Sequence, residues 1–106
     1  MFNPDHWDRA SHMVGEPVVD KDNHKIGRVD AIAEARDEME PEWLVVRTSL
    51  FGRPRLIPID SVREVDDEIR VPFSKRTVLL APVPEILTNV GRAERQALEF
   101  HYKKAA

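Results

Sequence analysis

The chain has 106 residues, of which 42% are hydrophobic and 33% are charged, and it contains no cysteine. This length predicts one domain with a core large enough to fold alone, and the lack of cysteine excludes disulfides, thiolate metal sites and cysteine nucleophiles. The formal net charge of −3 gives no overall basic field of the kind that nucleic-acid-binding proteins carry. The sequence has no apolar stretch long enough for a membrane span, and we expect a cytoplasmic protein because residues 1–8 do not have the basic and apolar regions of a signal peptide.

The N-terminal residues predict an arm followed by the first strand of a hairpin. Residues 1–14 have no usable periodicity, and we interpret them as a loose arm that can dock through Trp7 or Met13. A strand is expected over residues 16–20. The polar segment 21–25 follows, rich in residues that stabilise tight turns through side-chain hydrogen bonds to the backbone.

The partner strand of this hairpin is expected over residues 26–35, and its pattern contains an irregularity. Ile26 and Val29 are three residues apart, so they cannot share one face of a regular strand. Gly27 lies between them, and an interior glycine often marks a bulge that shifts the alternation by one residue. The sequence therefore predicts a β-bulge at or beside Gly27.

The clearest strand is expected over residues 42–50. Residues 43–46 (Trp-Leu-Val-Val) are all apolar, which indicates a strand that is covered on both faces. Short strands in antiparallel succession are expected to follow over 55–60, 62–65 and 69–73.

Two helical pieces complete the predicted elements. Ser74 is placed to cap a short helix that runs to about Leu80, where prolines at positions 82 and 84 prevent continuation. A second helix is expected over residues 92–103. Leu98 and Tyr102 are four residues apart and share one helix face, and His101 beside them is interpreted as part of a packed aromatic cluster.

Several segments, taken together in order and spacing, resemble the pattern of the photosynthetic-reaction-centre-barrel (PRC-barrel) family. They are Gly15–Asp20, Lys25–Asp30, Trp43–Arg47, Leu56–Ile59, Ile69–Ser74 and Ala81–Pro82. The resemblance covers roughly residues 13–82. It implies an all-β (β-rich) fold: a small six-stranded PRC-type barrel with a short helix after the last strand and a C-terminal helix. We accordingly expect an arm at 1–14, the barrel at 15–82 and a helical extension at 83–106.

The resemblance also implies a function in holding partners. Family members include the cytoplasmic domain of a reaction-centre subunit, the C-terminal domain of a ribosome maturation factor and stand-alone proteins, which share a fold rather than a catalytic motif. We therefore expect a non-enzymatic binding or scaffold module, without a cofactor, that binds a protein partner and itself. The first alternative is an RNA- or ribosome-associated factor, although the acidic balance argues against direct nucleic-acid binding. The second is a small-molecule-binding module.

The sequence offers weak metal-site candidates. Asp20, Asp22 and His24 have a superficial likeness to a calcium loop, but the required glycine and distal glutamate are missing, so we reject it. His6 and His12, with the aspartates at positions 5 and 8, could form a weak site, which the spacing disfavours. The four glycines are too far apart to build a phosphate-binding loop.

For an external partner, the expected contact is a hairpin tip made by Phe51, Arg53, Pro54 and Arg55. An exposed aromatic residue beside arginines is typical of an interface anchor. The alternative is that Phe51 packs into the end of the barrel. Truncating Phe51 to alanine should weaken partner capture in the first case and lower the melting temperature in the second.

We also expect a homodimer. The all-apolar strand leaves area that a small barrel cannot obviously cover by itself, and closed two-fold dimers are the commonest oligomers. The residues predicted in or beside this contact are Trp43, Val45, Leu98 and Tyr102.

Overall fold

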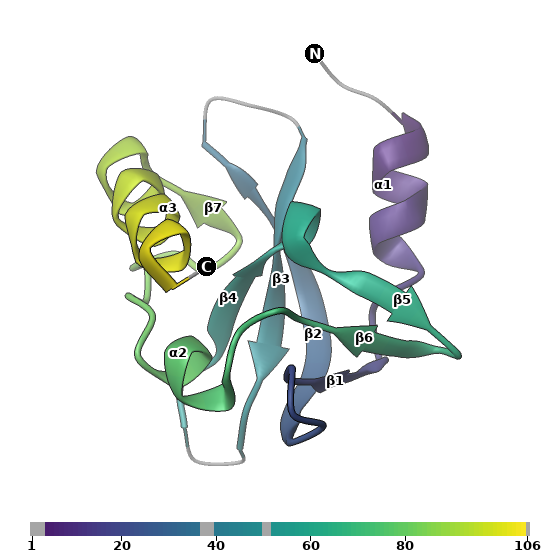
Figure 1. Cartoon of the computed structure of the whole chain (residues 1–106). Coiled ribbons are helices and arrows are strands. Elements are labelled where there is room, and N and C mark those ends of the chain that lie inside the picture. Colours follow the sequence, from purple (N-terminus) through teal and green to yellow (C-terminus); the bar gives the residue numbers. More distant parts are fainter. Residues whose placement is uncertain (1–3, 37–39, 50–51, 106) are drawn as a thin grey trace.

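The computed structural model describes residues 4–36, 40–49 and 52–105, with side chains from Trp7 onward. Its strands form a single sheet, and helices precede, interrupt and follow them along the chain (Figure 1). In chain order they are α1 (Pro4–Ser11), β1 (Pro17–Val19), β2 (Lys25–Ala35), β3 (Pro41–Arg47), β4 (Arg55–Pro58), the 3₁₀ turn η1 (Ile59–Ser61), β5 (Arg63–Val65), β6 (Glu68–Arg70), α2 (Lys75–Leu79), β7 (Asn89–Val90) and α3 (Arg92–Ala105).

All seven strands belong to one sheet, in the order β4-β3-β2-β1-β6-β5, with β7 paired to β2. Within the described residues this order ends at β4 and at β5, so hydrogen bonds do not close the sheet. The predicted β-rich barrel-type fold is confirmed. The expectation of purely antiparallel strands is wrong, because β1 pairs with β6, and β2 with β7, in parallel. The two-residue strand β7 was not predicted, since so short a segment carries no periodicity.

The predicted bulge lies in the β1–β2 hairpin. Val18 pairs with Gly27 while Val19 pairs with Lys25, so one residue of β2, Ile26, has no partner in the register. The extra residue shifts the alternation, and Ile26 and Val29 are both buried as a result. The turn between the strands places Asn23 at a φ of 66°, a conformation that asparagine tolerates well.

The described part of the N-terminal arm, from residue 4 onward, is ordered rather than loose. It forms α1, and Ala10 and Met13, three residues apart, are both buried. Docking through Met13 is therefore confirmed. Figure 1 shows α1 on the right of the molecule and α3 on the left, with the strands between them.

The two C-terminal helices begin and pack as their sequences suggest. Ser74 caps α2, because its Oγ accepts a hydrogen bond from the Thr77 amide (3.1 Å). Helix α3 is joined to β3 by the Arg95 guanidinium, which donates to Glu42 (2.6 Å).

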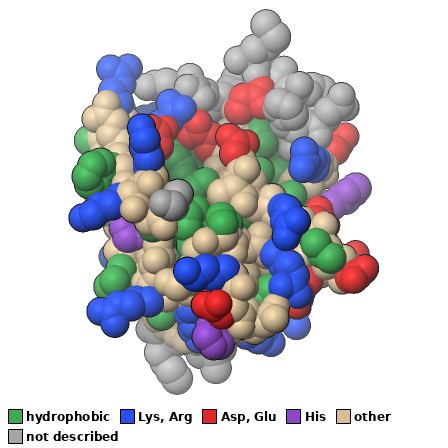
Figure 2. Space-filling model, in the orientation of Figure 1, with side chains coloured by type: hydrophobic (Ala, Val, Ile, Leu, Met, Phe, Trp, Pro, Cys, Tyr) green, Lys and Arg blue, Asp and Glu red, His purple; other side chains and the backbone are tan. Residues whose placement is uncertain are grey.

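Acidic and basic side chains are interspersed over much of the face seen in Figure 2. None of the helices in the described part of the chain has the length and apolar character needed to cross a lipid bilayer.

Candidate functional site

The predicted 51–55 tip is only partly visible in the structure. Phe51 lies outside the described residues. Arg53 is exposed, whereas Pro54 and Arg55 are half-buried. Arg55 is the first residue of β4 and pairs with Val46, so it belongs to the sheet more than to the connection. Arg53 is therefore the one fully exposed side chain among the described members of the predicted site.

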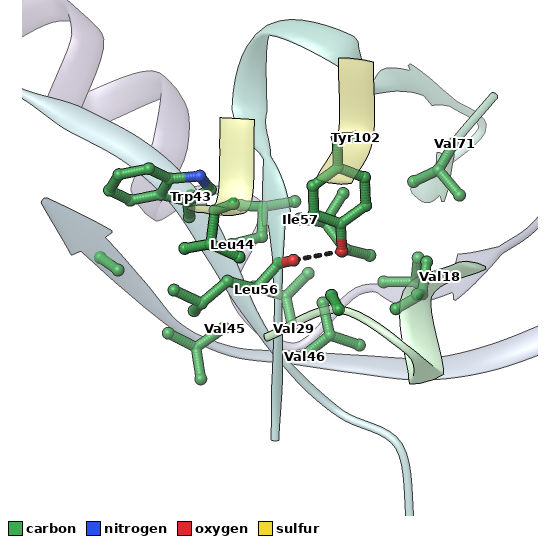
Figure 3. Packing of buried hydrophobic residues seen from close by; sticks show 14 of the residues in the cluster. Val18, Val29, Trp43, Leu44, Val45, Val46, Leu56, Ile57, Val71 and Tyr102 are labelled. Atoms are coloured by element: carbon green, nitrogen blue, oxygen red, sulfur yellow. Dashed lines mark hydrogen bonds between the residues drawn. The ribbon is translucent and has the colours of Figure 1, made fainter. Parts of the chain in front are cut away.

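The four residues predicted for self-association lie in the core of a single chain, and Figure 3 shows Trp43, Val45 and Tyr102 among the packed side chains. Trp43 and Val45 are each 3% exposed, Leu98 is fully buried, and Tyr102 is 3% exposed. The sequence suggested that these side chains needed a second copy to cover them. The chain covers them itself, because α1 and α3 both pack against the sheet. These four side chains offer no free surface for a dimer contact, and the homodimer itself remains a prediction.

Tyr102 joins α3 to β4 through a buried hydrogen bond. Its hydroxyl donates a hydrogen bond to the backbone carbonyl of Leu56, 46 residues earlier in the chain (Figure 3). Burial raises the pKa of Tyr102 well above its usual value, so the hydroxyl stays a donor. The ring of Phe73 lies 4.7 Å away and that of His101 lies 5.1 Å away, edge-on. The aromatic cluster predicted around His101 is confirmed, and the His101 Nε2 atom lies 2.8 Å from the Thr77 carbonyl oxygen.

Asp20 is a buried carboxylate, 1% exposed, at the start of the β1–β2 turn. Its Oδ1 accepts hydrogen bonds from the backbone amides of Asp22 and His24, both at 2.8 Å, and its Oδ2 accepts one from the amide of Lys75 at 3.0 Å. Burial by itself raises the pKa of Asp20, but these amides stabilise the charged form more strongly and lower the pKa to about 2. Asp20 therefore holds the turn against the start of α2.

The same turn is the only place in the described part of the chain where three metal-type ligand groups come together. Single ligand atoms of Asp20, Asp22 and His24 lie within 4.8 Å of one another. A carboxylate has about four acceptor positions. Asp20 fills them with the three amides and with the His24 Nδ1 atom at 3.2 Å. The donor set therefore does not fit a cation, in agreement with the rejection of a calcium loop.

A second unusual carboxyl group lies just before β1. Burial, the facing carboxyl group of Glu64 and, to a smaller extent, Asp67 raise the pKa of Glu16 to about 7. The Glu16 Oε2 atom is buried and makes no hydrogen bond within the described structure. Glu16 consequently binds a proton near neutral pH, and loss of this proton destabilises the folded state.

Among the described residues, the most exposed large apolar side chain lies on α3 and marks a surface that the sequence reasoning missed. Phe100 is 69% exposed and Leu80, just after α2, is 64% exposed. A groove of about 230 Å³ lies between α3 and the chain segment 82–84, with Ala93 and Ala97 on the helix side. We call the exposed Phe100 together with this groove the α3 surface.

A signal for the α3 surface was present in the sequence. Ala93, Ala97 and Phe100 follow the four-then-three spacing of one helix face. That face is distinct from the one carrying Leu98 and Tyr102, which packs inward. Helix α3 is therefore apolar on two sides, and only the inner side was recognised from the sequence.

The match to a family model agrees with the fold. The chain matches the family model of the PRC-barrel domain over residues 8–78. It is also similar to a solved structure assigned as a 16S ribosomal RNA processing protein, RimM, of Pseudomonas aeruginosa, with 26% identity and a TM-score of 0.48 over 62% of this chain and 43% of that one. This chain thus corresponds to less than half of that protein's length, and so partial a match carries no argument about function. No curated protein matches the chain.

The family match spans more than half of the chain and falls on the sheet, from the end of α1 through most of α2. The chain belongs to the PRC-barrel family.

Proposed function

We propose that the chain is a non-catalytic cytoplasmic binding module that holds protein partners, and that one of these partners is a second copy of itself. The observation that carries the proposal is the α3 surface, where one helix carries both a protruding aromatic ring and one wall of a groove. The lack of cysteine suits a reducing compartment. The saturated acceptors of Asp20 support a structural rather than a chemical role for the one compact cluster of acidic and histidine side chains among the described residues.

The α3 surface has the composition of a protein contact. Large aromatic side chains are enriched at protein interfaces and supply most of the binding energy when they insert into pockets. Phe100, at 69% exposed, keeps most of its ring in water in the single chain. The groove on the same helix is lined mostly by apolar residues, with the buried Leu98 among them and Glu94 as its charged member. Burying Phe100 in such a groove would remove apolar area from both sides.

A second copy fits this surface because the ring and one wall of the groove belong to the same helix. In a two-fold dimer each copy presents the same surface, so a contact that inserts a group of one copy into a hollow of the other occurs twice. Ala93 and Ala97 leave room beside the helix, whereas larger side chains would fill it. Two copies related by a two-fold axis would therefore exchange Phe100 into each other's groove. In this proposal the homodimer contact lies on the Phe100 side of α3 instead of on Leu98 and Tyr102.

The test is co-capture of an untagged copy by a tagged copy of the same chain, with and without nuclease. We expect the untagged copy to be retained in both conditions, and Phe100→Glu to abolish its retention because a charge cannot enter an apolar groove without a partner. Loss of capture on nuclease treatment would instead favour the RNA-associated alternative. Loss with Phe51→Ala but not with Phe100→Glu would move the contact to the 51–55 tip.

A further inference from the structure

A depression of about 340 Å³ lies on a different part of the molecule, between the β1–β2 turn and the β5–β6 hairpin. Its lining includes three basic side chains from separate positions in the chain, Lys21, Arg63 and Arg70, together with Ser61 and the buried Val71. Figure 2 shows Lys and Arg side chains gathered over β5 and β6. Basic groups therefore converge here on a chain whose formal net charge is −3.

Two of these basic groups are direct neighbours across a strand pair. Arg63 of β5 is opposite Arg70 of β6 in the antiparallel register, so both side chains extend from the same face of the hairpin. Like charges in directly opposite positions destabilise a strand pair. Glu68 offsets part of this charge through an ion pair with Arg70 (3.1 Å). Arg63 makes no ion pair with the described residues, and an anion bound between the two arginines would relieve the repulsion.

The guanidinium of Arg70 is held in place and still has N–H groups that can donate to a ligand. The Nη1 of Arg70 donates to the side chain of Asn23 (2.6 Å), which fixes the guanidinium beside the β1–β2 turn. A guanidinium has five N–H donors, so several remain after this bond and the Glu68 contact. Asp20 also lines the depression, but its carboxylate oxygens already accept hydrogen bonds from three backbone amides. The one acidic residue among the described lining residues is therefore engaged with the turn instead of with the arginines.

We propose that this depression binds a small phosphate-bearing molecule through Lys21, Arg63 and Arg70. A phosphate group carries close to two negative charges and three strong acceptor oxygens, which suits donors that approach from several directions. Arginine pairs with such oxygens in a planar, two-pronged geometry, and lysine adds a mobile point charge. A singly charged carboxylate would satisfy fewer of these groups. The site is separate from the α3 surface, so its outcome does not depend on self-association.

The experiment is a titration of the full chain with sodium pyrophosphate at constant ionic strength. Binding is monitored through the backbone amide chemical shifts. Two other anions serve for comparison. Inorganic phosphate provides a single phosphate group with close to two charges, and acetate provides a carboxylate with one charge. We expect saturable shifts confined to residues 20–24 and 61–72, tightest for pyrophosphate and absent for acetate. Arg63→Gln and Lys21→Gln, both at exposed positions that should not affect folding, are each expected to weaken binding about tenfold, since each removes one charge-assisted hydrogen bond.

Arg76→Gln is the matched control, because Arg76 is exposed on α2 and does not line the depression. It should bind pyrophosphate like the unmodified chain. Shifts spread over all basic residues, equal weakening by Arg76→Gln, or unchanged binding in Arg63→Gln would each overturn the proposal. So would binding of a single-stranded oligonucleotide at these residues without binding of pyrophosphate, since the site would then recognise a nucleic-acid chain instead of a small anion.

Discussion

The carboxylate of Asp20 accepts a hydrogen bond from the backbone amide of Lys75, 55 residues later in the chain, at 3.0 Å. This bond joins the β1–β2 turn to the first residue of α2, whose free amides have no partner within the helix. A neighbouring backbone bond, from the Lys21 amide to the Phe73 carbonyl (3.3 Å), ties the same two segments together. The β1–β2 turn and the start of α2 are thus joined through one buried side chain.

Asp20→Ala should destabilise the fold by about 2–4 kcal/mol, because several buried amides lose a charged acceptor at once. Urea denaturation at neutral pH measures this loss. Asp22→Ala is the control, since the Asp22 side chain is exposed although its amide belongs to the same turn. A cost for Asp20→Ala no larger than that for Asp22→Ala would contradict the structural role.

The same carboxylate predicts an acid dependence. The pKa of Asp20 is about 2 in the folded chain, against an ordinary value of 3.8. The folded state therefore favours the charged form, and the resulting stability is complete above about pH 4 and is lost as the pH falls towards 2. The unfolding free energy of Asp20→Asn should fall less steeply than that of the unmodified chain across this window. Parallel curves would rule this out.

Glu16 predicts a pH dependence of the opposite sign. Its pKa is raised to about 7 in the folded chain, so the folded state binds a proton that the unfolded state releases near pH 4.5. The unfolding free energy should consequently decrease as the pH rises from 4.5 through about 7. Glu16→Gln, which stays neutral, should equal the unmodified chain at the acidic end and exceed it in stability above neutral pH.

Denaturation of both chains across this range checks the prediction, with the exposed Glu85→Gln as a control that should leave the difference unchanged. If Glu16→Gln is less stable than the unmodified chain above neutral pH, the carboxylate makes a favourable contact there and the account of Glu16 is wrong.

Gly27 is required by a close approach of two strands. A Cβ atom at this position would lie 1.9 Å from the backbone oxygen of Arg47 and 2.8 Å from its carbonyl carbon. The backbone of Gly27 is not left-handed, so this contact, and not a positive φ, requires glycine here. Gly27→Ala should therefore cost about 3 kcal/mol or more, because strands β2 and β3 must separate to admit one methyl group.

Gly52→Ala provides the comparison for this prediction. The nearest atom to its added Cβ is the Ser49 hydroxyl at 2.7 Å, the end of a side chain that can rotate. We expect a loss below about 1 kcal/mol there. Equal losses at the two positions would show that the contact with Arg47 does not decide the requirement for glycine.

The local features of the fold could be predicted because each depends on neighbouring residues. The bulge followed from the three-residue spacing of Ile26 and Val29, and the start of α2 followed from the capping hydroxyl of Ser74. The parallel pairing of Val18 with Ile69 could not be predicted, since it joins segments far apart in the chain and leaves no trace in either one. The order of α1 was also missed, because its apolar side is short and is completed only by contact with the sheet.

The candidate site was harder to predict for a related reason. Exposed and buried apolar residues look alike in a sequence. Whether such a residue is exposed or buried depends on which surfaces the rest of the chain covers. Trp43 and Val45 appeared to need a partner, yet the chain buries both. Phe100 carried no prediction from the sequence, yet it is 69% exposed on α3.

Sedimentation equilibrium of the pure chain at micromolar concentrations tests the central claim most directly. The account predicts a mass of twice 12.2 kDa for the unmodified chain, and the mass of one chain for Phe100→Glu with unchanged thermal stability. Val65→Glu is the matched control, since Val65 is 40% exposed on β5, across the molecule from α3 (Figure 1), and should remain dimeric. A single-chain mass for the unmodified protein, or a dimer that survives Phe100→Glu, would contradict the assignment of the α3 surface as the self-association site.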